Sequence, residues 1–118
     1  MHTYLNSTGS FWLDENGNYW SYSTKMSEYY KGEFFKNVTT YSVTTSKHQG
    51  NIPYVDFNHQ LYVGRYGDWN IENVIKDNIN SLISENKRRI EKRRTKNNLE
   101  QIEINKQKIE YLQNLLNE

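Results

Sequence analysis

Hydrophobic and polar residues follow two different patterns along this chain, and the change falls near residue 68. Before it, short apolar runs alternate with turn residues, and sixteen of the seventeen aromatic residues lie between Tyr4 and Trp69. After it, aliphatic residues recur at steps of three and four, which is typical of an amphipathic helix. We therefore expect an α+β protein, with a small antiparallel β domain at 1–67 and a charged helical tail at 68–118.

The first region predicts an antiparallel, meander-like sheet of short strands. Apolar runs at 10–13 and 19–22 flank an Asn16-Gly17 pair. This pair favours a type I′ hairpin turn, because both central residues of that turn need positive φ. Further strands are expected on either side of Lys31-Gly32, over the β-branched and aromatic run 39–43, and in a hairpin that joins 54–57 to 60–63.

The second region predicts helix in two stretches. Two geometries fit the gap between their apolar stripes: a helical hairpin that bends near 95–98, or one long helix whose distal stripe pairs with a partner chain. Asn97 with Glu100 resembles a capping box and favours a fresh helix start there. The first stripe comprises Ile71, Val74, Ile75, Ile79, Leu82, Ile83 and Ile90, and the second Leu99, Ile102, Ile109, Leu112 and Leu116. Pairing of two chains would use Ile102, Ile109, Leu112 and Leu116.

Within the first region lies a distinctive run that is rich in polar residues, Tyr41–Gln49. Its hydroxyl residues are typical of a helix N-cap, so we expect a short helix through Gln49 that ends at Gly50. One interpretation is an ordinary cap. The other is an anion site, in which free amides act together with the side chains of Thr44, Thr45, Ser46, Lys47 and His48.

The segment 19–50 resembles a family of small proteins encoded by phages and mobile elements. In that family a strand rich in Ser and Tyr and a short hairpin lead into a Tyr-Ser-x-Thr-Thr-Ser-Lys-His-Gln motif. This chain has that motif at Tyr41–Gln49, after Tyr22-Ser23-Thr24 and Tyr30-Lys31-Gly32. The resemblance implies a phage or prophage origin, and it brings no assigned biochemical activity with it.

A basic run in the helical tail is the second candidate site. Residues 87–96 contain seven cations and one anion, although the whole chain has a formal net charge of only +1. Such a helix would follow a nucleic-acid backbone or face an acidic protein groove, or it would be an ordinary solvated face. The cations are Lys87, Arg88, Arg89, Lys92, Arg93, Arg94 and Lys96.

Aromatic residues are the third candidate, because rings on a sheet surface stack on bases or fill partner pockets. Trp12, Trp20 and Tyr22 are the candidate anchors. Aromatic residues make up 14% of a chain whose mean hydropathy is only −1.01, so the alternative is that most of these rings form the core.

Composition narrows the classes of function. The chain has no Cys, and His2, His48 and His59 do not have metal-ligand spacing, so we expect no metal or other cofactor. No phosphate loop or nucleophile motif occurs, which favours a non-enzymatic protein. There is no long apolar run and no leader-like start, so we expect a cytoplasmic protein of the bacterial host cell without a membrane partner.

Two functions fit these features. The first is a phage-derived, anti-CRISPR-like inhibitor of a host defence nucleoprotein, which acts by occupying a binding surface on the protein or its RNA or DNA. The alternative is an accessory or regulatory protein that binds nucleic acid directly through the basic helix. A virion or assembly component that oligomerises through the distal stripe is a third option.

Overall fold

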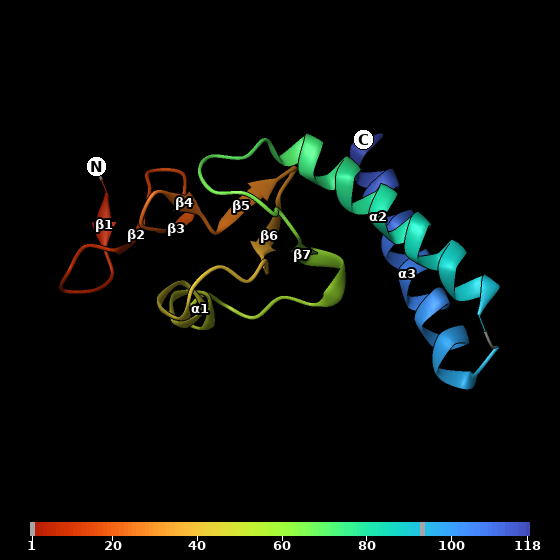
Figure 1. The fold of residues 1–118 in the computed structure, drawn as a ribbon. Coiled ribbons are helices and arrows are strands. Elements are labelled where there is room, and N and C mark those ends of the chain that lie inside the picture. Colours follow the sequence, from red (N-terminus) through yellow and green to blue (C-terminus); the bar gives the residue numbers. More distant parts are fainter. Residues whose placement is uncertain (1, 93) are drawn as a thin grey trace. The chain divides into compact units, whose positions relative to one another are not determined.

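The computed structural model describes residues 2–92 and 94–118, which form two compact units. The first unit ends at Ile71 and the second begins at Glu72, whereas the sequence predicted a boundary at 67. Strands dominate the first unit, and the second is built from two long helices (Figure 1). The expected α+β class is confirmed.

A four-stranded antiparallel sheet opens the first unit, in the order β1-β2-β3-β4. Tyr4, Trp12, Trp20 and Lys25 face one another across it in register. Because side chains alternate between the faces of a strand, these four lie on one face, while Phe11 and Ser21 lie on the other. The strands are β1 (Thr3–Tyr4), β2 (Phe11–Leu13), β3 (Tyr19–Ser21) and β4 (Thr24–Lys25).

The turn between β2 and β3 is not the type I′ turn that the sequence predicted. Gly17 has a φ of 81°, but Asn16 does not share the positive φ. The Asp14 carboxylate instead accepts the backbone N–H groups of Asn16 and Asn18, both at 2.9 Å, and the Gly17 N–H donates to the Asp14 carbonyl at 3.2 Å. An aspartate at the start of the loop thereby favours a longer turn that closes at a left-handed glycine.

A second, three-stranded sheet has the order β5-β6-β7. Its first two strands form the hairpin that the sequence predicted, with φ of 50° at Lys31 and 81° at Gly32. The predicted hairpin of 54–57 with 60–63 is wrong, because β7 runs parallel to β6 and a 3₁₀ turn precedes it. The elements are β5 (Ser27–Tyr30), β6 (Glu33–Asn37), η1 (Phe57–His59) and β7 (Gln60–Leu61).

The predicted strand at 39–43 is also absent from the described chain, whereas the short helix after it is present as α1 (Val43–Gly50). Ser42 is the N-cap, and its hydroxyl accepts the Thr45 N–H at 3.1 Å. The cap therefore sets extended backbone at Ser42 and helix from Val43 onward.

The core of the first unit is mostly aromatic. Phe11, Met26 and Ile52 form a buried cluster, and the half-buried rings of Tyr19, Phe34 and Tyr41 pack against it. Phe35 and Leu61 are also fully buried. Since large rings bury more apolar area than aliphatic side chains, a chain poor in Leu and Val still acquires a core.

The second unit is an antiparallel helical hairpin of α2 (Ile71–Glu91) and α3 (Lys96–Leu116), as Figure 1 shows. Of the two geometries that the sequence left open, the hairpin is therefore the one observed. Thr95 is the N-cap of α3 and accepts the Asn98 N–H at 3.2 Å, so the predicted capping box at Asn97 and Glu100 is wrong by two residues.

A buried layer of polar side chains sets the register of the hairpin. The Asn105 amide donates to the Asn86 side chain at 3.0 Å and also to the Glu85 carboxylate. Gln101 donates to Asn105 at 2.8 Å, and Asn86 donates to the backbone carbonyl of Ile102. Asn86 and Asn105 are both buried, and a shift of one helix along the other would leave them without partners.

Candidate functional site

The motif Tyr41–Gln49 forms α1 with its cap, and its polar side chains bond to other segments of the first unit. His48 Nδ1 lies 2.7 Å from Ser21 Oγ, which also donates to the Thr45 hydroxyl at 3.1 Å. The Gln49 amide donates to the backbone carbonyls of Asn37, at the end of β6, and of Thr39 just after it. The Ser21 bonds join α1 to the four-stranded sheet and the Gln49 bonds join it to the end of β6, so the motif has a structural role.

The five residues of the predicted anion site do not gather on one surface. Thr45 and His48 are buried toward Ser21, while Thr44, Ser46 and Lys47 are exposed. Burial lowers the pKa of His48, which favours the neutral imidazole at neutral pH and removes one of the two expected cations. Of the two interpretations of the motif, the structure favours the helix cap.

Of the three predicted aromatic anchors, the structure brings two together. Trp12 and Trp20 stack with ring centroids 5.0 Å apart on one face of the four-stranded sheet, and each indole N–H is bonded: Trp12 to the Tyr22 carbonyl, Trp20 to Asp14. The Tyr22 ring lies instead beside His48, with a centroid separation of 5.8 Å. Tyr22 is 53% exposed.

The predicted basic run occupies the last turns of α2, the connection and the first turn of α3. Arg89 differs from the others, because it bonds Asn98 across the hairpin at 2.9 Å and Glu85 along α2 at 3.4 Å. Arg93 lies outside the described residues. We call the remaining five cations, all exposed, the basic end: Lys87, Arg88, Lys92, Arg94 and Lys96.

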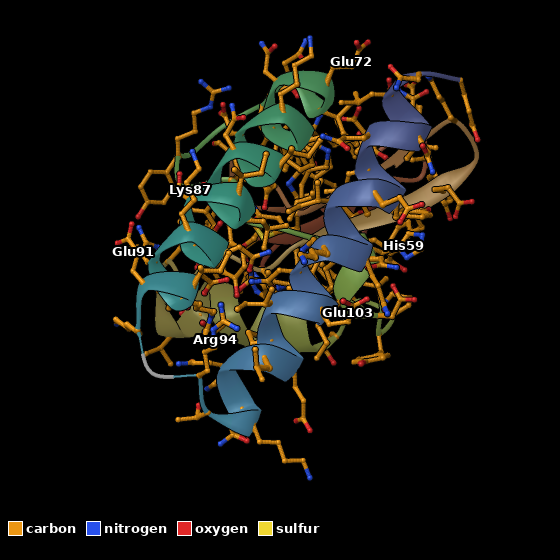
Figure 2. The ribbon with its side chains drawn as sticks, turned by 90° about the vertical axis from the view of Figure 1, so that its right-hand side faces the viewer. His59, Glu72, Lys87, Glu91, Arg94 and Glu103 are labelled. Atoms are coloured by element: carbon orange, nitrogen blue, oxygen red, sulfur yellow. The ribbon has the colours of Figure 1, made fainter. Side chains whose placement is uncertain are left out.

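The basic end has a defined position on the hairpin. In Figure 2, Lys87 and Arg94 lie on the half nearest the connecting segment, with Glu91 beside them, and Glu72 lies at the opposite end of α2. Folding the run into two helices, rather than into one, brings cations from both sides of the connection to the same end of the unit. This concentration of charge is a consequence of the hairpin.

Sequence reasoning missed an apolar groove beside the basic end. A pocket of about 230 Å³ is lined by the aliphatic side chains of Ile90, Leu99 and Ile102, by Asn98, and by the cations Arg89, Arg94 and Lys106, of which Arg94 belongs to the basic end. Ile90 is 54% and Leu99 50% exposed, although the periodicity placed both on the buried stripe. Their positions near the connection explain this exposure, because there is little of the facing helix left to cover them.

The residues predicted to pair two chains lie mainly inside the hairpin. Ile102 and Leu112 are buried, and Ile109 and Leu116 are half-buried. The distal stripe therefore serves the packing of this chain itself.

The described residues contain neither a candidate membrane-spanning helix nor a candidate metal cluster. Within residues 2–92 and 94–118, no helix combines the length and apolar character needed to cross a membrane. Over the same residues, no three His, Asp or Glu side chains lie close enough together to hold a metal ion.

Comparisons of this chain with models of protein families, with curated proteins and with solved structures find no match. Function is therefore inferred from the residues themselves.

Proposed function

We propose that this protein acts by binding rather than by catalysis, and that the basic end is the surface that meets its partner. The supporting observation is the exposure of five cations around the connection of one helical hairpin. The polar layer of Asn86 and Asn105 and the cap at Thr95 stabilise that end. A clustered cationic surface attracts polyanions and accelerates their association.

The groove at the basic end favours a partner that contains protein as well as nucleic acid. Ile90 and Leu99 expose aliphatic surface between the cations. Phosphates would pair with the cations, but they would leave this apolar surface in water. A nucleoprotein offers both kinds of group, since an apolar side chain of the protein fills the groove while the bound nucleic acid meets the cations.

The proposed function is accordingly that of an inhibitor of a host defence nucleoprotein, similar in action to anti-CRISPR proteins. It would occupy a binding surface of the complex within the bacterial host cell. The resemblance of residues 19–50 to proteins of phages and mobile elements supports this choice of partner, because such elements must evade host defence.

The second candidate is an accessory protein that binds nucleic acid directly. The same five exposed cations favour it. Direct binding would weaken steeply with salt, by roughly 0.7 powers of salt concentration for each phosphate of a single strand that is neutralised. An interface that includes the apolar groove would weaken less, because burial of apolar surface is not screened by salt.

The test is an affinity capture with the tagged full chain from lysate of a bacterium that carries such a defence system, with and without nuclease. Under the inhibitor proposal, a defence effector is recovered in both samples, and the purified effector with its guide RNA loses target binding when the protein is added. Recovery of nucleic acid alone, which disappears after nuclease treatment, would support the accessory protein. Recovery of neither would contradict both.

A further inference from the structure

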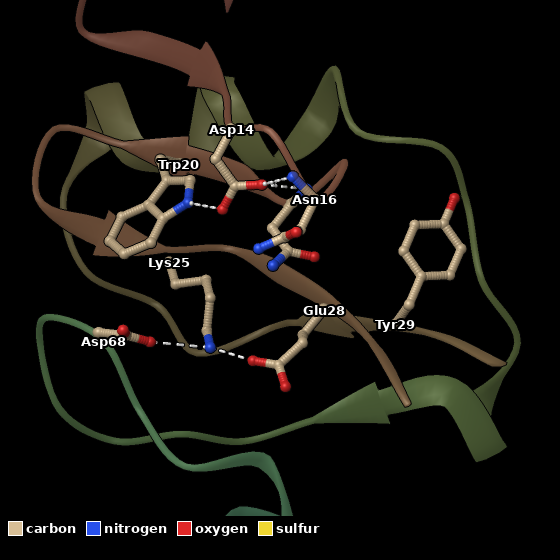
Figure 3. A pocket seen from close by; sticks show the side chains of 8 residues that line it. Asp14, Asn16, Trp20, Lys25, Glu28, Tyr29 and Asp68 are labelled. Atoms are coloured by element: carbon tan, nitrogen blue, oxygen red, sulfur yellow. Dashed lines mark hydrogen bonds and ion pairs between the residues drawn. The ribbon is translucent and has the colours of Figure 1, made fainter. Parts of the chain in front are cut away.

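A pocket in the first unit is lined by no residue of the hairpin or of the motif at Tyr41–Gln49. Its volume of about 330 Å³ is several times the roughly 30 Å³ that one water occupies in the liquid, so it accommodates a group of side-chain size. It is lined by the turn after β2, by β3, β4 and β5, and by the segment that precedes α2. Figure 3 shows its charged and aromatic side chains.

The pocket carries excess negative charge. Three carboxylates, those of Asp14, Glu28 and Asp68, line it with a single ammonium group, Lys25, which leaves an excess of two negative charges. Lys25 bonds one oxygen of Glu28 and, at 2.8 Å, one oxygen of Asp68. Because a carboxylate has two oxygens, Glu28 and Asp68 each keep one that no described side chain uses.

The second observation is a buried acceptor without a partner. Asn18 lines the pocket and is only 8% exposed, and its Oδ1 has no hydrogen-bond partner among the described residues. The other end of the Asn18 amide faces the Asp14 carboxylate. Burial raises the pKa of Asp14, but hydrogen bonds from the Trp20 indole, from two backbone amides and from the Asn18 side chain outweigh it and lower that pKa.

The neighbouring Asp14 indicates which end of the Asn18 amide is unpaired. The Asn18 side chain lowers the pKa of Asp14, and since a carboxylate only accepts hydrogen bonds, the NH₂ end of the amide is the end that faces Asp14. The carbonyl oxygen is the atom left over. Buried acceptors are nearly always bonded in native proteins, which indicates that a donor from outside the chain belongs here.

Aromatic rings flank the acceptors. In Figure 3, Trp20 and Tyr29 lie on opposite sides of the cluster, with Asp14 above and Glu28 and Asp68 below. Tyr29 is 54% exposed, and so forms an open wall of the pocket. The faces of such rings attract cations, and a planar cation also stacks on them.

We propose that this pocket binds a guanidinium group. A guanidinium is planar, permanently charged and carries five N–H donors. Those donors would meet the free oxygens of Glu28 and Asp68 and the Asn18 carbonyl, while the plane of the group lies against an aromatic ring. A neutral sugar or amide would supply donors but would leave the excess negative charge uncompensated.

The test is titration of the isotopically labelled full chain with N-acetyl-arginine amide and with N-acetyl-citrulline amide, followed by NMR. The two compounds have the same shape, but the second is uncharged. The proposal predicts that the arginine compound shifts the Trp20 indole and Asn18 side-chain signals and binds at least about tenfold more tightly than the citrulline compound. Equal affinities for the two compounds, or shifts confined to other residues, would overturn it.

Variants connect the binding to the pocket. Asp68→Asn removes a charge from an exposed position and leaves the bond from Lys25 to the Trp69 carbonyl, so it should fold and weaken the arginine compound severalfold. Glu28→Gln should weaken it further. Glu15→Gln is the matched control, since Glu15 lies beside Asp14 in the turn after β2 but does not line the pocket. It should leave the affinity unchanged. Wild-type affinity in both pocket variants would contradict the proposal.

A guanidinium has two sources: a free compound or an arginine of a partner protein. A short peptide with one central arginine distinguishes them. Much tighter binding of the peptide than of the arginine amide would identify a partner's side chain, and equal affinity would identify a free guanidino compound. Because the pocket lies in the first unit, Arg88→Glu in the hairpin should leave the titration unchanged, which separates this proposal from the function proposed for the basic end.

Discussion

The first unit and the hairpin are stabilised in different ways. In the first unit the strands have two to five residues, and side chains bond to the backbone of distant segments: Gln49 to Asn37 and Thr39, and Trp69 to Lys25. In the hairpin the helices have 21 residues each, and most of the bonds that connect them run between side chains, as from Asn105 to Asn86. Short elements satisfy few of their own backbone groups, so the first unit depends on side chains that the hairpin does not need.

The difference also separates the two candidate sites. The basic end results from regular helices that present a run of cations, and its residues are exposed and free to change partners. The acidic pocket results from the irregular unit, where a turn contributes three side chains and three strands and a loop each contribute one or two. The charge of the basic end therefore follows from the sequence of regular helices, whereas the charge of the acidic pocket depends on tertiary contacts.

The largest expected effect is loss of the aromatic core of the first unit. Phe35 is fully buried, so Phe35→Ala should lower the free energy of unfolding by about 3–5 kcal/mol. Urea denaturation followed by near-UV circular dichroism measures this, because nearly all aromatic residues lie in that unit. Tyr54→Ala removes a ring that is 85% exposed and should change the value by less than about 0.5 kcal/mol. Similar losses in both variants would show that Phe35 is not a core residue.

The next effect tests the polar layer of the hairpin. Asn105→Ala removes the hydrogen-bond partner of the buried Asn86 carbonyl oxygen, of one Glu85 oxygen and of the Gln101 amide, so we expect a loss of about 1–3 kcal/mol. The free energy of unfolding is measured from the loss of the helical circular dichroism signal with increasing urea concentration. The exposed Asn80 on α2 is the control, and Asn80→Ala should be neutral or slightly stabilising. An Asn86→Ala, Asn105→Ala double variant should lose less than the sum of the single losses, and strict additivity would contradict a direct bond.

A pH dependence should arise in the first unit from His48. Burial lowers the pKa of its imidazole in the folded protein, whereas the unfolded chain binds the proton at the ordinary value of about 6.5. The stabilisation is therefore complete above pH ~6.5 and is lost as the pH falls below it toward the lower folded pKa. Unfolding free energies measured across this range for wild type and His48→Gln test it, and the variant should show a flatter profile.

Two carboxylates contribute to the pH dependence of stability in a separate, lower pH range. Burial raises the pKa of Asp14, but hydrogen bonds from the Trp20 indole and from backbone amides outweigh it and lower that pKa, and the hydrogen bond from His59 lowers the pKa of Asp56. Their stabilisation is lost only as the pH falls below the ordinary carboxyl value of about 3.9. These carboxylates therefore do not mask the effect of His48 near pH ~6. Identical profiles for wild type and His48→Gln in that range would contradict the role of His48.

The smallest effect compares the helix caps of the two units. Ser42→Ala and Thr95→Ala each remove a hydroxyl that accepts a first-turn N–H, at a cost of about 1 kcal/mol. Ser42 also donates to the Thr45 hydroxyl, which accepts a bond from Ser21, and Ser21 is bonded in turn to His48, so the loss in Ser42→Ala should be the larger. Chemical denaturation of both variants measures the order. The reverse order would show that the network around α1 adds nothing to the cap.

Periodicity and capping predicted the parts of this fold that local sequence decides. The helices at 71–91 and 96–116, α1 and the Lys31-Gly32 turn follow from spacing and from single cap or turn residues. The parallel pairing of β7 with β6 does not, because it joins only two residue pairs across a long separation in sequence. The Asn16-Gly17 turn was predicted wrongly because the Asp14 side chain competes for the same amides.

The candidate sites divide in the same way. The basic run is evident in the sequence, but its division into an exposed set and a structural Arg89 depends on Asn98 across the hairpin. The acidic pocket has no local pattern, since Asp14, Glu28 and Asp68 are far apart in sequence, and only the last two meet at Lys25. A buried lysine that gathers carboxylates leaves no periodic trace.

The central claim is that the basic end binds the partner, and one matched pair of variants tests it most directly. Arg88→Glu and Lys76→Glu make the same change at exposed positions of α2, but only Arg88 belongs to the basic end. The measurement is the amount of partner recovered by each tagged chain in the nuclease-treated capture, quantified by mass spectrometry. Severalfold lower recovery with Arg88→Glu and wild-type recovery with Lys76→Glu is the predicted result. Equal recovery by Arg88→Glu and wild type would contradict the claim.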